Sequence, residues 1–310
     1  MDGTDFNNAL GFTLNLAMTI SSRSWPSPAK LNLFLHLLGR RKDGYHKLQT
    51  VFQLLDYGDE LSFTPRTDRQ INCSCLSLLN PVTSAVIPDA DNLVIKAANL
   101  LQAKTKTYPG VDILIKKRIP IGGGLGGGSS NAATTLIALN FYWQLKLKSN
   151  ELLRLGLTLG ADVPLFIDGR TSWAEGIGEK LQTIVLPEKW FLVLVPPVSI
   201  STTKLFSHPQ LTYTTTAIRI QTFLDGHLKT HNDFETLVQK DYPVVAEALD
   251  FLNHFAPARL SGTGSCVFAA FDTKLQAEVV LKKIKPHYEG FISKGSIISP
   301  LLKTVEHFKQ

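Results

Sequence analysis

A glycine-rich run in the middle of the chain has the composition of a phosphate-binding loop. Six glycines fall within residues 122–128, and Ser129 and Ser130 follow directly. Glycines leave the backbone amides open to close approach by an anion, because no side chain intervenes. These residue types favour binding of a phosphate-bearing ligand, and the alternative is a flexible linker.

The segments on either side of the run favour phosphate binding over a linker. Residues 111–115 combine apolar and β-branched positions and predict a strand. After the run, Ser129 or Ser130 is expected to cap a helix that continues to Phe141. A strand, a glycine loop and a helix N-terminus form a phosphate cradle, because the first N–H groups of the helix point at the ligand.

The run matches neither of the two commonest nucleotide motifs. A Walker loop would end in Gly-Lys-Ser/Thr, and no lysine lies between Arg118 and Lys146. The dinucleotide fingerprint needs an early strand and an acidic residue about 20 positions on. This run lies in mid-chain and is followed by Asn140 and Phe141. The charged groups for phosphate chemistry must therefore come from elsewhere in the chain.

Asp162 is the first candidate for such a group. A predicted helix from about residue 150 to residue 159 ends at Gly160, and Pro164 biases Val163 toward an extended backbone. A rigid polar loop of this kind suits a catalytic carboxylate. The alternative is an Asx-turn that only stabilises the loop.

Lys30 is the second candidate. Residues 29–37 alternate as a strand, with Leu31, Leu33, Leu35 and Leu37 on one face and Lys30, Asn32, Phe34 and His36 on the other. Lys30 and Asn32 therefore share a face, from which Asn32 could bind a substrate. The alternative for Lys30 is an ordinary surface lysine at a strand end.

Composition excludes several classes of protein. The net charge of +6 favours anionic ligands, but the only dense basic cluster is 40–42, so we expect no nucleic-acid partner. Three cysteines provide neither a disulfide framework nor a four-ligand zinc site, which predicts reduced thiols in the cytoplasm. The apolar stretch 9–20 is too short to span a membrane and lacks a preceding basic segment, so we expect no membrane partner.

Further elements predict an α+β chain in two lobes that meet near residue 170. Asp43-Gly44 predicts a turn before a strand that starts at about Leu48. The other expected elements are helices at 89–103, 244–255 and 274–284, a strand at 191–195, a surface loop at 211–217 and a second glycine loop within 260–268.

Three motifs together resemble the GHMP kinase superfamily: the glycine run, Leu-Gly-Ala-Asp-Val-Pro at 159–164 and Ser-Gly-Thr-Gly at 261–264. The segments 28–33, 43–46 and 54–59 narrow the resemblance to the branch that acts on a cytidine-linked substrate. The resemblance covers about residues 25 to 300. It implies ATP-dependent phosphorylation of the 2-hydroxyl of cytidine-diphosphate methylerythritol, in the non-mevalonate route to isoprenoid precursors.

The resemblance also implies a domain layout. Residues 25–170 would form a ribosomal-S5-like, ATP-binding domain, and residues 171–310 a smaller α+β domain on the substrate side. Residues 1–24 would be an N-terminal extension, of which we expect 1–17 to be dispensable.

The same resemblance assigns roles to individual residues. Lys30 and Asp162 would be catalytic. Asn32, Tyr45, His46 and Phe206 would bind the substrate, with Tyr45 and Phe206 stacking on cytosine and His46 reading its edge. ATP would be held by Asn92, Leu93, Pro120, Ile121, Gly122, Gly123, Gly124, Leu125, Gly126, Gly127, Gly128, Ser129 and Ser130. Asp91 or Asn92 could also cap a helix.

Some implications stay open at the level of the sequence. The loop 261–264 would close over the phosphate loop, or it is a structural turn. Mg²⁺ is expected with ATP, but no paired carboxylates are dedicated to it, so we assign no metal ligand. The chain would be a monomer or a homodimer. The competing functions are another GHMP kinase, for homoserine or mevalonate, and a non-catalytic nucleotide- or RNA-binding protein. Tyr45 and His46 argue against the first, and Lys30 with Asp162 against the second.

Overall fold

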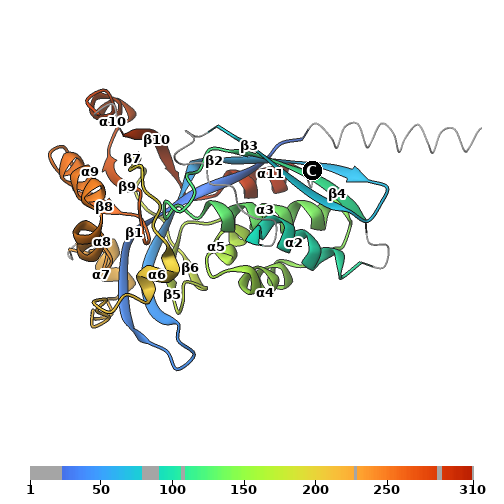
Figure 1. The fold of residues 1–310 in the computed structure, drawn as a ribbon, viewed down its shortest axis with the longest axis horizontal. Coiled ribbons are helices and arrows are strands. Elements are labelled where there is room, and N and C mark those ends of the chain that lie inside the picture. The colour runs from blue at the N-terminus through green and yellow to red at the C-terminus, as the bar shows by residue number, and fades with distance from the viewer. Residues whose placement is uncertain (1–22, 79–90, 106–108, 227–228, 285–287, 309–310) are drawn as a thin grey trace, which may run out of the picture.

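The computed structural model describes residues 23–78, 91–105, 109–226, 229–284 and 288–308. Residues 1–22, which make up nearly all of the expected N-terminal extension, lie outside these ranges. The described chain is an α+β fold, elongated and two-lobed, as predicted (Figure 1). No helix in the described ranges is long and apolar enough to cross a membrane.

Ten strands of the described chain form one continuous sheet with the order β3-β4-β2-β10-β7-β9-β8, to which β1, β5 and β6 attach. The first two strands are long and run through both lobes (Figure 1). The bounds are β1 (Trp25–Arg40), β2 (His46–Arg66), β3 (Ile71–Ser77), β4 (Gly110–Lys117), β5 (Ser172–Glu175), β6 (Lys180–Thr183), β7 (Trp190–Val195), β8 (Ala258–Leu260), β9 (Val267–Phe271) and β10 (Glu289–Ser296).

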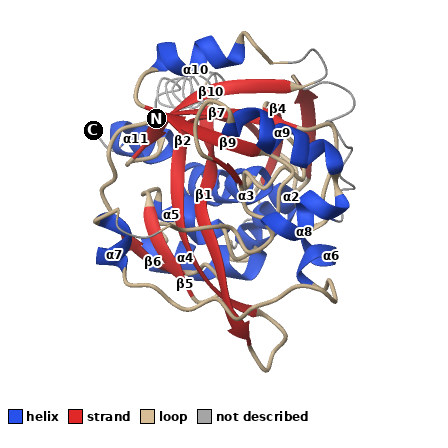
Figure 2. Cartoon of the chain, turned by 90° about the vertical axis from the view of Figure 1, so that its left-hand side faces the viewer, coloured by secondary structure: helices blue, strands red, loops and turns tan. Residues whose placement is uncertain are grey.

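The helices divide between the two ends of this sheet (Figures 1 and 2). The first group is α2 (Leu93–Gln102), α3 (Gly127–Tyr142), α4 (Ser149–Leu159), α5 (Val163–Asp168) and α11 (Pro300–Phe308). The second group is α6 (Thr202–Phe206), α7 (Ile220–Leu224), α8 (Glu235–Asp241), α9 (Pro243–Asn253) and α10 (Lys274–Leu281).

Each lobe has its own apolar core. One core packs α2 to α5 against β2 and β4, and it includes Ala174 and Leu301. The other packs α8 to α10 against β7, β8 and β9, and it includes Leu35 and Leu37. Both cores therefore take residues from either side of position 170. The predicted limits of the domains stay a prediction.

The predicted elements around the glycine run are confirmed as β4, α3 and α4. The predicted cap of α3 is wrong. The helix begins at Gly127, at least three residues earlier than a serine cap would allow, after Gly126 in the left-handed conformation (φ 73°), and no side chain caps it. The Ser130 hydroxyl instead accepts a hydrogen bond from Ser27 at 2.9 Å. The first N–H groups of α3 are consequently left without a side-chain partner at this end.

The expectation of an extended Val163 is also wrong, because Val163 is the first residue of α5. Pro164 lies in the first turn of that helix, where a missing N–H breaks no intrahelical hydrogen bond. Asp162 therefore stands at the start of a short helix rather than in a loop.

Strict alternation in the first strand ends at a β-bulge. Asn32 pairs with Phe52 and Leu35 pairs with Thr50, so β1 advances three residues while β2 advances two. The extra residue reverses the faces, since side chains alternate with a period of two. Leu35 thus joins Lys30 and Asn32 at the same cavity. Phe34, predicted on the face of Lys30, packs on Trp173 instead.

Candidate active site

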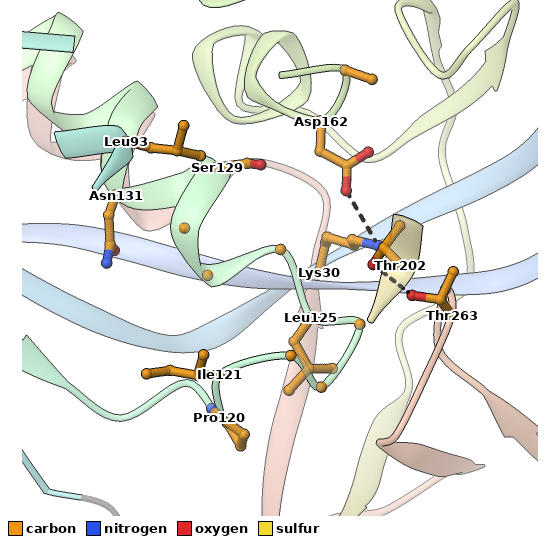
Figure 3. Close-up of a pocket in the computed structure, with 18 of the residues that line it drawn as sticks. Lys30, Leu93, Pro120, Ile121, Leu125, Ser129, Asn131, Asp162, Thr202 and Thr263 are labelled. Carbon is orange, nitrogen blue, oxygen red and sulfur yellow. Dashed lines mark hydrogen bonds and ion pairs between the residues drawn. The ribbon is translucent and has the colours of Figure 1, made fainter. Parts of the chain in front are cut away.

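A cavity of about 840 Å³ lies where the two lobes meet. Its lining comes from β1, β2, β3, the end of β4, the start of α2, the glycine run, the residues before α5, helix α6 and the loop at 262–263. Figure 3 shows Asp162 above Lys30, Ser129 to their left, Thr202 next to Lys30 and Thr263 further to the right. Both predicted catalytic residues line this cavity, as do most of the predicted ligand-binding residues.

Lys30 and Asp162 form an ion pair, with 3.5 Å between Nζ and Oδ2 (Figure 3). The lysine side chain is 4% exposed, whereas that of Asp162 is 32% exposed. Burial lowers the pKa of Lys30, and the neighbouring Asp162 carboxylate opposes that shift. Asp162 makes no side-chain cap to α5, so its carboxylate is not used in the way the Asx-turn alternative requires. It faces the cavity.

The glycine run folds into a tight loop at the N-terminus of α3. Gly122, Gly124 and Gly126 have φ values of 70°, 75° and 73°, which L side chains rarely adopt. A Cβ on Gly124 would come within 2.0 Å of the Ser261 carbonyl oxygen, so only glycine fits there. Residues 120–129 all line the cavity. The loop and helix therefore supply amides and a positive dipole end to an anion.

The second glycine loop packs directly against the first. The Ser261 hydroxyl donates to the Gly124 carbonyl at 3.1 Å, and the Cys266 amide donates to that of Gly123 at 3.2 Å. Thr263 lines the cavity and shares a hydrogen bond of 2.9 Å with Thr202. This loop thus belongs to the cavity wall and links the phosphate loop to the second lobe.

Sequence reasoning missed Lys117, a cationic group that precedes the glycine run. Its Nζ lies 2.5 Å from Oδ2 of Asp59, and both side chains are buried. The other oxygen of Asp59 accepts the backbone amides of Arg118 and Ile119, each at 2.7 Å. Lys117 lines the cavity. Lys117 is the last residue of β4, shortly before the glycine run, and this position could have identified it. The Walker motif places its lysine after the glycines, where this chain has none.

One end of the cavity is formed by the start of α2 and the edge strand β3. Asn92 caps α2, since its Oδ1 accepts the Val94 amide at 3.0 Å, which confirms the cap considered for it. Leu93 lines the cavity beside it, and so do Cys73 and Cys75. An apolar side chain and polar backbone next to a phosphate loop suit a planar heterocycle.

The opposite end contains part of the predicted substrate site. Phe206 lines the cavity, and its ring packs on His46 with 5.2 Å between centroids. His46 is buried behind it, and its Nε2 has no hydrogen-bond partner. Tyr45 is 58% exposed and does not line the cavity. Ser130 is likewise absent from the lining, because it is buried against Ser27.

The described residues do not provide a dedicated magnesium site. Within those ranges no group of three His, Cys, Asp or Glu side chains could hold a metal ion. Asp162, the carboxylate nearest the reaction centre, is paired with Lys30. A magnesium ion that enters with ATP would be held mainly by phosphate oxygens.

Comparisons with known proteins agree with this fold and site. A model of the GHMP kinases N terminal domain matches residues 92–170, and one of the GHMP kinases C terminal matches residues 226–290. Fold and site together define a GHMP kinase. Relatives from Hahella chejuensis (304 aligned residues, 95% of this chain and 99% of the relative) and Pseudomonas aeruginosa (283 residues, 91% and 97%) are each 50% identical to it. The chain belongs to their family, the 4-diphosphocytidyl-2-C-methyl-D-erythritol kinases.

Solved structures extend the comparison. A crystal structure of a 4-(cytidine 5'-diphospho)-2C-methyl-D-erythritol kinase is 28% identical, covers 88% of this chain and all of its own, and superposes with a TM-score of 0.75. The Methanococcus jannaschii mevalonate kinase reaches a TM-score of 0.61 at 17% identity, over 88% of this chain and 98% of its own. The second likeness is one of fold alone.

Proposed function

We propose that this cavity transfers the γ-phosphoryl group of ATP to the 2-hydroxyl of 4-diphosphocytidyl-2-C-methyl-D-erythritol. The observation that carries the proposal is the Lys30–Asp162 pair, which lines the same cavity as the glycine run and Phe206. A phosphate-binding loop on one side and an aromatic ring on the other support a nucleotide donor and a base-containing acceptor.

Asp162 would accept a hydrogen bond from the attacking hydroxyl and orient its oxygen toward the γ-phosphorus. A carboxylate is a weak base, with an ordinary pKa of about 3.9. The transition state of phosphoryl transfer is loose and needs little early deprotonation of the nucleophile, so orientation contributes more than basicity. The proton would pass to Asp162 as the bond to phosphorus forms.

Lys30 would stabilise the negative charge that develops on the transferring group while it keeps Asp162 in place. Its ammonium is buried, so its electrostatic effect is less screened than that of a surface lysine. Asn32 lies on the same strand and lines the same cavity, which supports its predicted contact with the substrate.

ATP would place its phosphates at the amides of the glycine run and at Ser129. Lys117 would add the positive charge that the run itself lacks, and Asn92 with Leu93 would receive the adenine ring. Mg²⁺ would enter with the phosphates and neutralise part of their charge. Ser130 would contribute only through its place in the first turn of α3, since its hydroxyl is bonded to Ser27.

Phe206 would stack on the cytosine ring of the acceptor. His46 is buried behind it and does not line the cavity, so its unpartnered Nε2 would read the pairing edge only after the side chains rearrange on binding. Tyr45 remains the proposed second stacking residue, and its exposed ring would have to move over the bound base. The remaining predictions are a monomeric or homodimeric state and a cytoplasmic location. The three cysteines form no disulfide in the described residues, which supports a reducing compartment.

A coupled ADP-release assay tests the proposal. The full chain is supplied with ATP, Mg²⁺ and one of three acceptors: the cytidine-linked methylerythritol, mevalonate or homoserine. We expect turnover with the first alone, because only it carries a base that can stack on Phe206. Turnover with mevalonate or homoserine, and none with the cytidine-linked acceptor, would contradict the proposal.

A further inference from the structure

We infer that Thr50, a residue outside the cavity lining, is a positioning residue that orients Lys30 through the side-chain amide of Asn32. The inference rests on the proposed function, because it concerns a lysine assigned to phosphoryl transfer. Thr50 lies on β2 and is fully buried. The chain of contacts from the Phe34 carbonyl through Thr50 to Asp162 has four links, three hydrogen bonds and one ion pair.

The first link is set by the bulge in β1. Phe34 falls between the paired positions Asn32 and Leu35, and its carbonyl oxygen accepts a hydrogen bond from the Thr50 hydroxyl. A carbonyl oxygen can only accept, so the one hydroxyl proton of Thr50 is committed to Phe34. Oγ1 of Thr50 can then act only as an acceptor toward its other neighbours.

The second link is the amide of Asn32, whose Nδ2 donates to Oγ1 of Thr50 at 2.9 Å. A carboxamide can present either its oxygen or its NH₂ group in a given direction, and its neighbours decide which. Because Oγ1 of Thr50 can only accept here, Asn32 must turn its NH₂ group, and not its oxygen, toward Thr50. Since Asn32 is 2% exposed, its amide is shielded from competing water.

The third and fourth links hold the lysine. With its NH₂ group turned to Thr50, Asn32 presents Oδ1 to Lys30, whose Nζ donates to it. The same Nζ lies 3.5 Å from Asp162 and 5.3 Å from the centre of the Phe52 ring. A reversed amide would set an NH₂ group against the ammonium, donor against donor. The Thr50 hydroxyl therefore excludes the amide orientation that would repel Lys30.

The test compares Thr50→Val, Thr50→Ser and Thr171→Val in the full chain. Thr171 is a matched control, because it is also buried, donates to a carbonyl (Ser296, 2.8 Å) and accepts from a side-chain amide (Gln53, 3.2 Å). Its partner Gln53 does not line the cavity, whereas Asn32, the partner of Thr50, does. Thr50→Val should lower kcat about tenfold, with KM for ATP changed less than about twofold. Thr50→Ser should restore kcat.

The pH profile separates positioning from a structural effect. Burial lowers the pKa of Lys30, and an acceptor at Asn32 favours its charged form. Thr50→Val should therefore move the alkaline limb of the kcat–pH profile to lower pH. Thr171→Val should leave that limb in place, even if it lowers the melting temperature as much as Thr50→Val does. An unmoved limb in Thr50→Val overturns the inference, whatever its loss of stability.

A second measurement needs no substrate, so it tests the positioning role of Thr50 separately from the proposed reaction. Lysine labelled with ¹⁵N at Nζ reports the titration of Lys30 by NMR, assigned through Lys30→Met. We expect its midpoint to fall in Thr50→Val and to return in Thr50→Ser. Equal midpoints in the wild type and Thr50→Val overturn the role of Thr50, even in an enzyme that turns over the acceptor as proposed.

Discussion

Nζ of Lys30, near the start of the described chain, lies 3.5 Å from Oδ2 of Asp162 at the start of α5. The glycine run comes between them in sequence and next to them in space, since the Lys30 amide donates to the Leu125 carbonyl at 3.0 Å. The fold thus joins a buried cation and a half-buried carboxylate at the phosphate loop.

Replacing Lys30 with methionine should remove the charge but keep the length of the side chain. We expect kcat to fall roughly 100-fold or more, because a buried cation that stabilises the transition state is lost. KM for ATP should change little. Steady-state kinetics measure both, and Lys104→Met, at an exposed lysine after α2, is the control. A variant with near-normal kcat would show that Lys30 has no catalytic role.

Lys117 and Lys116 are neighbours whose side chains point to opposite faces of β4, which offers a matched pair. Lys117 is buried against Asp59 at the cavity, whereas Lys116 is exposed. Lys117→Met should raise KM for ATP about tenfold, since a charge-assisted contact to phosphate is lost. Lys116→Met should leave KM unchanged. Equal KM values for the two variants would remove Lys117 from the nucleotide site.

Phe206 should contribute to recognition of the cytidine-linked acceptor and not of ATP. Phe206→Leu loses the aromatic face, so KM for the acceptor should rise about tenfold, the scale of one base-stacking contact. Tyr45→Ala should have a similar effect only if the exposed ring closes over the bound base. Initial rates at varied acceptor concentration test both, with Phe255→Leu on the far side of the second lobe as control. An unchanged KM in Phe206→Leu would place the base elsewhere.

His36 should make stability depend on pH. Burial, aided by His231 and Arg259 and opposed by Asp233, lowers the pKa of His36 from its ordinary 6.5 to about 4. The unfolded chain therefore binds the proton first as pH falls, so stability is lost between about pH 6.5 and about pH 4. Both ring nitrogens of His36 are buried without partners, which agrees with a neutral ring.

The comparison with His36→Phe isolates the contribution of position 36, because all other titratable side chains are the same in both proteins. Phenylalanine keeps an aromatic ring next to Phe34 and His231. Urea unfolding should show the wild type losing more stability than the variant between about pH 7 and about pH 5. Parallel losses would indicate that His36 titrates normally.

Short-range sequence patterns predicted much of the fold and of the candidate site. The glycine run, the helix end at Gly160 and the alternation that places Lys30 beside Asn32 are each read within a few residues. The glycine run, Lys30 and Asn32 line one cavity, together with Asp162, which follows Gly160 by two residues. These features follow from backbone chemistry and side-chain periodicity, which need no knowledge of distant partners.

The features that sequence missed depend on contacts between distant segments. The bulge after Asn32 exists only in relation to β2, and the role of Lys117 depends on Asp59, which comes from another strand. Ser130 does not cap α3, because it lies inside the first turn of the helix and its hydroxyl is hydrogen-bonded to Ser27. Each of these outcomes is a tertiary contact that overrides a local preference.

The most direct test of the central claim is single-turnover transfer from ATP labelled in the γ-phosphoryl group to the cytidine-linked acceptor, with the product located by ³¹P NMR. We expect a phosphomonoester on the 2-hydroxyl in the wild type, and a rate lower by roughly 100-fold or more in Asp162→Asn with ATP still bound. A product phosphorylated at another hydroxyl, or an Asp162→Asn rate equal to that of the wild type, would contradict the central claim.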